Sequence, residues 1–140
     1  MSSNLSVATP YTFGTTVPMS VAEARPVVEA ALKAEGFGVL TEIDVAATMK
    51  AKLGIDGAPY LILGACNPPL AHRALEAEPS AGALLPCNIV IRAQDGQTIV
   101  EATDPAAVLK VVQSTAIEPI AREARERLLR VVASLASESN

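Results

Sequence analysis

The sequence predicts a single α+β domain in which helices pack against a mixed sheet of about five strands. The chain has 140 residues, of which 50% are apolar and 19% charged, as expected for one domain with its own core. Apolar runs typical of strands alternate with helical patterns early in the chain, and a hairpin signal follows later. The expected order is βαβαβαββαα, with a flexible tail over residues 1–9 and the domain over residues 10–136.

The first strand and helix are indicated by residue type and by a capping pattern. Residues 11–17 contain Thr, Phe and Val and are typical of a strand. Ser20 and Glu23 have the spacing of a capping box, and apolar residues follow at helical intervals. Pro26 lies beyond the first turn, where it removes a backbone hydrogen bond. The helix therefore either kinks at Pro26 or begins near it.

The next segments have clear borders. Residues 37–43 predict a second strand, and Asp44 can cap a short helix that Gly54 ends. The most apolar stretch of the chain, residues 60–66, is too short for a confident helix and predicts a buried central strand.

The same signal for the start of a helix occurs twice in the remaining part of the chain. Asn67-Pro68 and Asp104-Pro105 each combine a preferred capping residue with a proline in the first helical position. Between them, residues 87–92 predict a strand, and Asp95-Gly96 predicts the turn of a hairpin. An apolar stripe over residues 118–135 predicts a long final helix.

Charge and composition exclude several functional classes. The net charge is −4, and the basic residues near the C-terminus alternate with glutamates, so we expect no nucleic-acid partner. No apolar run approaches the roughly 18 residues of a membrane span, and residues 1–10 lack the features of a signal peptide. We therefore expect no membrane association and a cytoplasmic location. Two cysteines are too few for a secreted disulfide scaffold.

Three segments carry a family resemblance. Residues 35–44 (EGFGVLTEID), 63–68 (LGACNP) and 85–89 (LPCNI) occur in the order typical of the prokaryotic family called domain of unknown function 302. The chain resembles that family from about residue 11 to residue 135. The resemblance implies a compact α+β fold and no known reaction, and it assigns no functional role to His72.

Cys66 and Cys87 form the candidate site. Cys66 ends one predicted strand and Cys87 begins the next, so the two residues meet at one edge if these strands pair antiparallel. Cys66 also precedes a helix N-terminus, where a thiolate is stabilised and its pKa lowered. The simpler interpretation is that both cysteines are core residues, since free cysteine is among the most buried residue types.

Three functions remain open. A small ligand would contact Cys66, Asn67, Cys87 and Asn88, and a soft metal ion, zinc or copper, would be held by Cys66, Cys87 and His72. The alternative is a thiol-dependent enzyme or redox protein with Cys66 as nucleophile. The third is a non-catalytic interaction module. Asn67 is otherwise a helix cap, and His72 one partner of an exposed helical pair with Glu76. The sequence identifies no cofactor.

Glu42 and Asp44 flank Ile43, so their carboxylates lie on one face of an extended strand and could do acid–base work or bind a cation. The simpler interpretation is that Asp44 caps the helix that follows and that Glu42 faces solvent.

A homodimer is expected from the apolar character of this small chain. Its mean hydropathy is +0.33, and apolar surface that one core cannot cover often forms an interface. Dimers with twofold symmetry are the commonest closed assembly.

Overall fold

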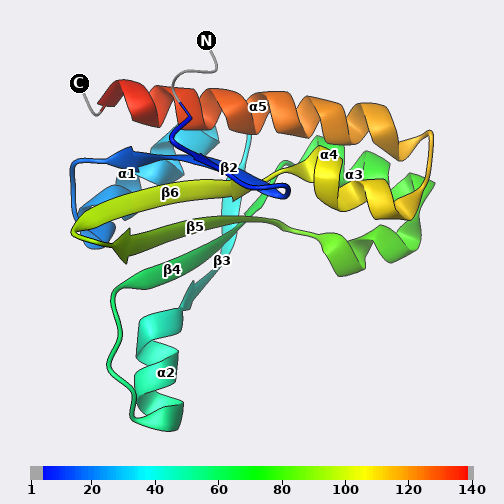
Figure 1. The fold of residues 1–140 in the computed structure, drawn as a ribbon. Coiled ribbons are helices and arrows are strands. Elements are labelled where there is room, and N and C mark those ends of the chain that lie inside the picture. The colour runs from blue at the N-terminus through cyan, green and yellow to red at the C-terminus, as the bar shows by residue number, and fades with distance from the viewer. Residues whose placement is uncertain (1–4, 139–140) are drawn as a thin grey trace.

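The structure is a computed structural model that describes residues 5–138. Six strands form one sheet in the order β1-β2-β6-β5-β4-β3, and every neighbouring pair is antiparallel (Figure 1). The strands are β1 Val7–Ala8, β2 Thr12–Val17, β3 Gly38–Asp44, β4 Tyr60–Cys66, β5 Cys87–Gln94 and β6 Gln97–Thr103.

Five α-helices accompany the sheet. They are α1 Val21–Ala34, α2 Val45–Leu53, α3 Pro68–Ala77, α4 Pro105–Leu109 and α5 Ile117–Glu138. Short 3₁₀ segments follow α3 (Pro79–Leu84) and α4 (Lys110–Val112). None of the helices within residues 5–138 combines the length and apolar content that crossing a bilayer requires.

The predicted α+β class is confirmed, but the sheet differs from the mixed sheet that we expected. It is antiparallel throughout because neither α2 nor α3 carries the chain back across the sheet to start a parallel strand. The strands before and after each of these helices are direct antiparallel neighbours. The sixth strand is β1, which lies in the segment expected to be a flexible tail and pairs with β2.

The local sequence signals predicted the ends of most helices and strands correctly. Ser20 and Glu23 form the capping box of α1, and Pro26 lies inside that helix, which begins at Val21. Asp95 and Gly96 have φ values of 52° and 78°, which are the positive values that a tight hairpin turn between β5 and β6 requires. Gly54 ends α2 in the left-handed conformation.

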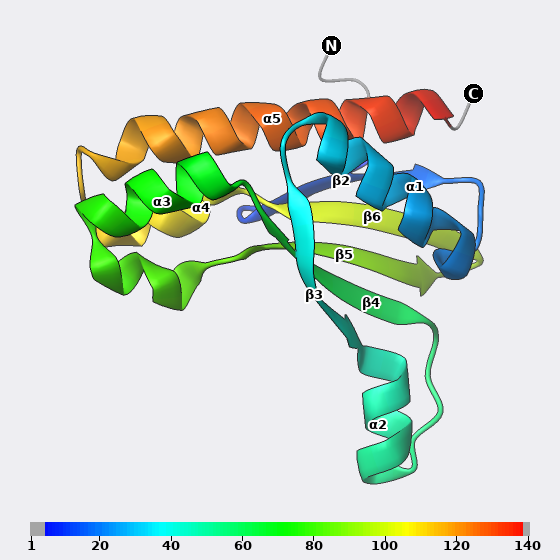
Figure 2. The ribbon, with the colours of Figure 1, turned by 180° about the vertical axis from the view of Figure 1, so that it is seen from behind.

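The core lies on one face of the sheet. Helix α1 contacts β3, β4 and β5, and α5 contacts β2 and β6, so the two helices cover the face seen in Figure 2. The larger apolar cluster joins the sheet to α1 and to the second half of α5, through residues such as Leu63, Ile91 and Leu128. A smaller cluster joins α3, α4 and the first half of α5, through residues such as Leu70, Leu109 and Ile120.

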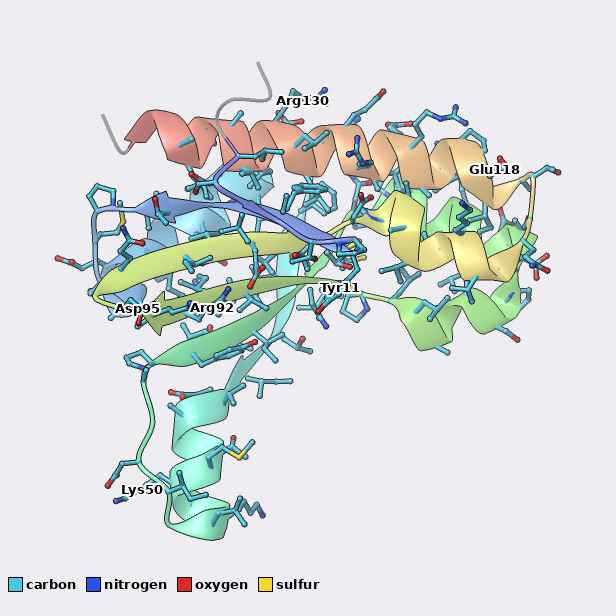
Figure 3. The ribbon with its side chains drawn as sticks, viewed as in Figure 1. Tyr11, Lys50, Arg92, Asp95, Glu118 and Arg130 are labelled. Carbon is cyan, nitrogen blue, oxygen red and sulfur yellow. The ribbon has the colours of Figure 1, made fainter. Side chains whose placement is uncertain are left out.

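Helix α2 projects away from this body. Figures 1 and 2 show it at the far end of an extension formed by β3 and β4. None of its residues is buried. Its exposure distinguishes it from the other helices, which pack on the sheet or on one another. Figure 3 shows Lys50 on this projection, far from Arg130 on α5.

Candidate functional site

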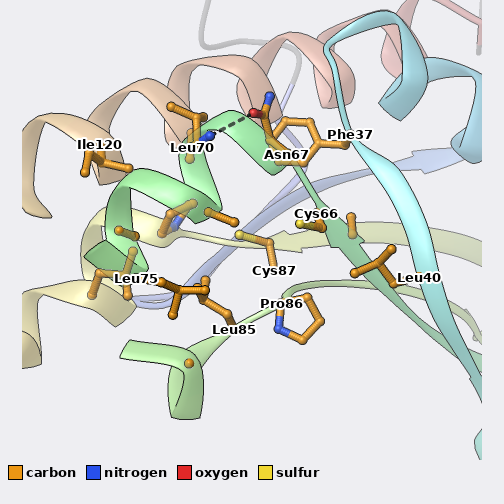
Figure 4. Close-up of a pocket in the computed structure, with 17 residues that line it drawn as sticks. Phe37, Leu40, Cys66, Asn67, Leu70, Leu75, Leu85, Pro86, Cys87 and Ile120 are labelled. Carbon is orange, nitrogen blue, oxygen red and sulfur yellow. Dashed lines mark hydrogen bonds between the residues drawn. The ribbon is translucent and has the colours of Figure 1, made fainter. Parts of the chain in front are cut away.

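The two cysteines lie side by side at one end of the sheet, as the antiparallel prediction required. Ala65 is the partner of Cys87 in the β4–β5 ladder, so Cys66 lies one residue beyond that pair. Both thiols are free and partly buried. Cys66 is followed by Asn67, the cap of α3. The end of β4, the start of β5 and the N-terminus of α3 therefore converge at these residues (Figure 4).

A cavity of about 270 Å³ opens beside the cysteines. It lies where the two apolar clusters meet, and its walls come from the strand ends, from α3 and from the facing sides of α4 and α5. Apolar side chains dominate the lining, which includes Phe37, Leu70, Ala74, Leu85, Leu109 and Ile120. Figure 4 shows the two sulfur atoms on its wall, between Leu40 and Leu75. This apolar lining is suited to an apolar ligand rather than to a charged one.

Asn67 lines this cavity, but helix α3 uses its amide oxygen. The side-chain Oδ1 accepts a hydrogen bond of 3.2 Å from the backbone N–H of Leu70, as expected of a helix cap. The Nδ2 atom faces Gly36, since a Cβ built on that glycine would lie 2.9 Å from it. Asn67 therefore shapes the cavity through its position more than through free polar atoms.

The comparisons with known proteins cover nearly the whole chain. The model of the family described as "Domain of unknown function DUF302" matches residues 13–135. The chain belongs to the DUF302 family. Among solved structures it is similar to the uncharacterized conserved protein DUF302 from Bacillus stearothermophilus, with 30% sequence identity and a TM-score of 0.83. That match covers 89% of this chain and 97% of the other chain. No curated protein matches the chain.

Asn88 is not brought to the cavity of this DUF302 protein. It pairs with Gly64 in the β4–β5 ladder and is exposed. Successive side chains of a strand point to opposite faces of the sheet, so Asn88 points away from the side that Cys87 occupies. The prediction that placed Asn88 beside Cys87 relied on their adjacency in sequence. In a strand, adjacent side chains lie on opposite faces of the sheet, so the two side chains are separated.

His72 is also outside the cavity. Its side chain is 73% exposed on α3, and its Nε2 lies 3.4 Å from Oε1 of Glu76, the helical pair that the simpler interpretation expected. Within residues 5–138, no group of three or more His, Cys, Asp or Glu residues has the geometry to hold a metal ion. The predicted set of Cys66, Cys87 and His72 is therefore not assembled in this fold, because His72 lies on the solvent side of α3.

Burial shifts the pKa of both thiols in the same direction. Burial raises the pKa of the Cys66 thiol above its ordinary value. Burial, with a smaller contribution from the neighbouring Cys66, raises the pKa of Cys87 to about 11. The sequence led us to expect a lowered pKa at Cys66 from the N-terminus of α3. The shift at Cys66 is upward and its cause is desolvation, so both residues are neutral thiols near pH 7.

Glu42 and Asp44 have structural partners. Arg25 Nε donates a hydrogen bond of 2.8 Å to Glu42 Oε1. Asp44 Oδ1 accepts one of 2.9 Å from the backbone N–H of Ala47 and so caps α2. Asp44 therefore has the capping role that the simpler interpretation assigned to it, whereas Glu42 is exposed but also paired with Arg25.

Several cavity residues carried no signal in the sequence. Leu109, Ile120 and Ala124 come from α4 and α5, which are distant in sequence from both cysteines. Their apolar spacing predicted only that they are buried. Phe37 had a weak signal, since it is one of two phenylalanines in the chain and lies in a segment that carries the family resemblance.

Proposed function

We propose that this DUF302 protein binds a small, largely apolar ligand in the cavity beside Cys66, Asn67 and Cys87. The observation that supports this is the cavity itself, whose walls are almost entirely apolar and come from three strands, the 3₁₀ segment after α3 and the helices α3, α4 and α5. Sites for small molecules are typically concave, mostly apolar and preformed.

The size of the cavity sets the size of the ligand. An apolar cavity of about 150 Å³ is large enough to bind benzene, and this cavity measures about 270 Å³. It therefore fits a molecule larger than a single aromatic ring, such as a fused bicyclic compound or a short hydrocarbon chain. A charged group on such a ligand would have to remain at the mouth, because the walls offer it little compensation for lost solvation.

The cysteines fit this function as neutral wall residues. A protonated thiol is a small, polarisable and weakly polar group that packs well against apolar and aromatic surfaces. The raised pKa of each thiol argues against a role as nucleophile, which needs the thiolate, and no third donor among the described residues completes a metal site with them. Ligand binding therefore accounts for these residues better than thiol catalysis does.

A binding experiment with a filled cavity tests the proposal. Ala71 lines the cavity from α3 and is only partly buried, so Ala71→Phe can fill the space with little disturbance to the core. The neutral fluorescent probe N-phenyl-1-naphthylamine is titrated into the wild type and the variant. We expect saturable binding to the wild type and at least about a tenfold loss of affinity in Ala71→Phe, equivalent to about 1.4 kcal/mol.

His72→Phe is the matched control. It adds the same side chain to the next position of α3, where His72 faces solvent, and we expect its affinity to equal that of the wild type. Native mass spectrometry of the purified protein then detects any retained molecule. A wild type that binds no apolar probe, or two variants with equal affinity, would refute the proposal.

A further inference from the structure

The projection formed by residues 38–61 has an apolar surface that the rest of the chain does not cover. We call it the arm, and it comprises β3, α2 and the connection into β4. Of the eight large apolar side chains that are exposed among the described residues, five lie on the arm. They are Leu40, Ile43, Met49, Leu53 and Ile55. Leu53 is 64% exposed and Ile55 54% exposed. Scattered exposed side chains are ordinary, whereas this concentration on one projection indicates a contact surface.

Helix α2 lacks the packing that normally stabilises a short helix. It has nine residues and buries none of them. Isolated helices of fewer than about 12–15 residues are marginal in water, and packing of an apolar face supplies most helical stability in proteins. The cap at Asp44 and the left-handed Gly54 define its ends, but they do not replace a packing partner. The helix therefore points to a partner outside the chain.

The arm also contains an open edge of the sheet. Strand β3 is the last strand of the order β1-β2-β6-β5-β4-β3 and pairs on one side only, with β4. Its residues are exposed except for Val39, which is half-buried. An edge strand presents unpaired backbone N–H and C=O groups that can pair with another strand. Two copies of such an edge can pair antiparallel about a twofold axis.

Charge favours a second copy of the chain as the partner. Residues 45–57 contain Lys50, Lys52 and Asp56, which give this segment a net charge of +1. The whole chain has a net charge of −4, and the arm, which also contains Glu42 and Asp44, has −1, so the body outside the arm carries −3. Lys50 is already paired with Asp56 at 2.7 Å. The cationic end of one arm and the acidic body of another copy are thus complementary.

We propose that the arm is the interface of a homodimer, in which the β3 edges of two copies pair antiparallel about a twofold axis. The arm's apolar side chains, Leu53 and Ile55 among them, are then covered by the partner. The arm spans residues 38–61, which is close to the roughly 20–30 residues that each side of a standard interface contributes. Leu40 belongs both to the arm and to the lining of the cavity, so dimerisation also covers part of the cavity mouth.

Sedimentation equilibrium of the full chain tests this proposal. We expect a dimer for the wild type, and at least about a tenfold increase in the dimer dissociation constant for Leu53→Glu and, separately, for Ile55→Glu. Val111→Glu is the matched control, since Val111 is 66% exposed but lies outside the arm. Far-UV circular dichroism confirms that each variant is folded, and the two arm variants are independent tests of the same surface.

Hydrogen exchange distinguishes the proposed edge pairing from any other dimer. The amides of residues 38–44 that do not bond to β4 should exchange more slowly in the wild type than in Leu53→Glu. A monomeric wild type at all concentrations would overturn the proposal. A dimer that survives both arm substitutions, or that Val111→Glu disrupts to the same degree, would overturn it as well.

Discussion

Gly14 lies opposite Glu101 in the β2–β6 ladder, at a point where the two backbones leave no space for a side chain on Gly14. A Cβ built there would lie 2.7 Å from the Cα of Glu101 and 2.3 Å from the carbonyl oxygen of Val100. Both are backbone atoms, so neither can move by a simple side-chain rotation.

Gly14→Ala should therefore destabilise the protein. We expect the free energy of unfolding, measured by urea denaturation, to fall by about 1–3 kcal/mol, the usual cost of forcing an extra carbon into a packed site. Gly57→Ala is the control, because a Cβ on Gly57 meets no atom within 4 Å. That change should be neutral or stabilise by up to about 1 kcal/mol. Equal effects at the two positions would show that the close approach at Gly14 does not limit stability.

Removal of the Arg92 guanidinium should lower the stability of the fold, because it leaves the buried Glu101 carboxylate without its cationic partner. Arg92 Nε donates a hydrogen bond of 2.7 Å to Oε1 of Glu101, which is only 8% exposed. In Arg92→Met the carboxylate keeps only the hydroxyl of Thr12, and we expect thermal or urea unfolding to report a loss of about 1–3 kcal/mol.

The control for this ion pair is Arg73→Met. Arg73 Nη1 lies 3.7 Å from Glu123, and both side chains are well exposed, so we expect a change within about 0.5 kcal/mol. If Arg92→Met were as mild as the control, Glu101 would not depend on Arg92 for its charge.

The caps of α3 and α2 should differ in their effect on global stability. Asn67→Ala removes a cap from a helix that packs in the smaller cluster, and we expect a loss of about 1 kcal/mol. Asn67→Asp keeps an oxygen at the same place and should retain most of the stability. Asp44→Ala removes the equivalent bond from α2, but that helix buries nothing in its own chain. For the dissociated chain, urea unfolding should therefore be nearly unchanged by Asp44→Ala, and a loss equal to that of Asn67→Ala would contradict this.

Alkaline pH should destabilise the fold through Cys87. Its pKa rises from an ordinary value of 9.0 to about 11 in the folded protein. Between these two values the unfolded chain loses the proton while the folded chain keeps it, so the free energy of unfolding falls as the pH rises. The full contribution is at most about 3 kcal/mol.

Comparison with Cys87→Ala isolates this effect from other groups that titrate at alkaline pH. We expect the wild type to lose more stability than the variant between pH 9 and pH 11 in urea unfolding experiments. Parallel curves for the two proteins would mean that burial does not hold the Cys87 proton.

Most borders of this fold could be predicted because they depend on local chemistry. The capping box at Ser20, the Asp44 cap and the Asp95-Gly96 turn each act within a few residues, and each is present in the structure. The neighbourhood of Cys66 and Cys87 could also be predicted, since it needed only one assumption about how two consecutive strands pair.

The remaining features depend on contacts that local patterns do not encode. The alternation of strands and helices suggested crossovers, but it does not reveal that α2 projects from the sheet and buries nothing. The cavity joins Cys87 to Ile120, which are brought together only by the packing of α5 across both clusters. Burial in the same region raises the pKa of each thiol. The position of Cys66 before a helix N-terminus had predicted a lowered pKa instead.

Helix α5 also has a consequence for how the chain is made. Its first half completes the smaller cluster and its second half completes the larger one, through residues such as Leu128, Val132 and Leu135. All six strands precede it in the order of translation. The strands are therefore synthesised before the residues of α5 that complete the cover of the sheet's apolar face. Helix α1 can cover its part of that face early, but the part over β2 and β6 stays open until α5 is synthesised, at about 5–20 residues per second.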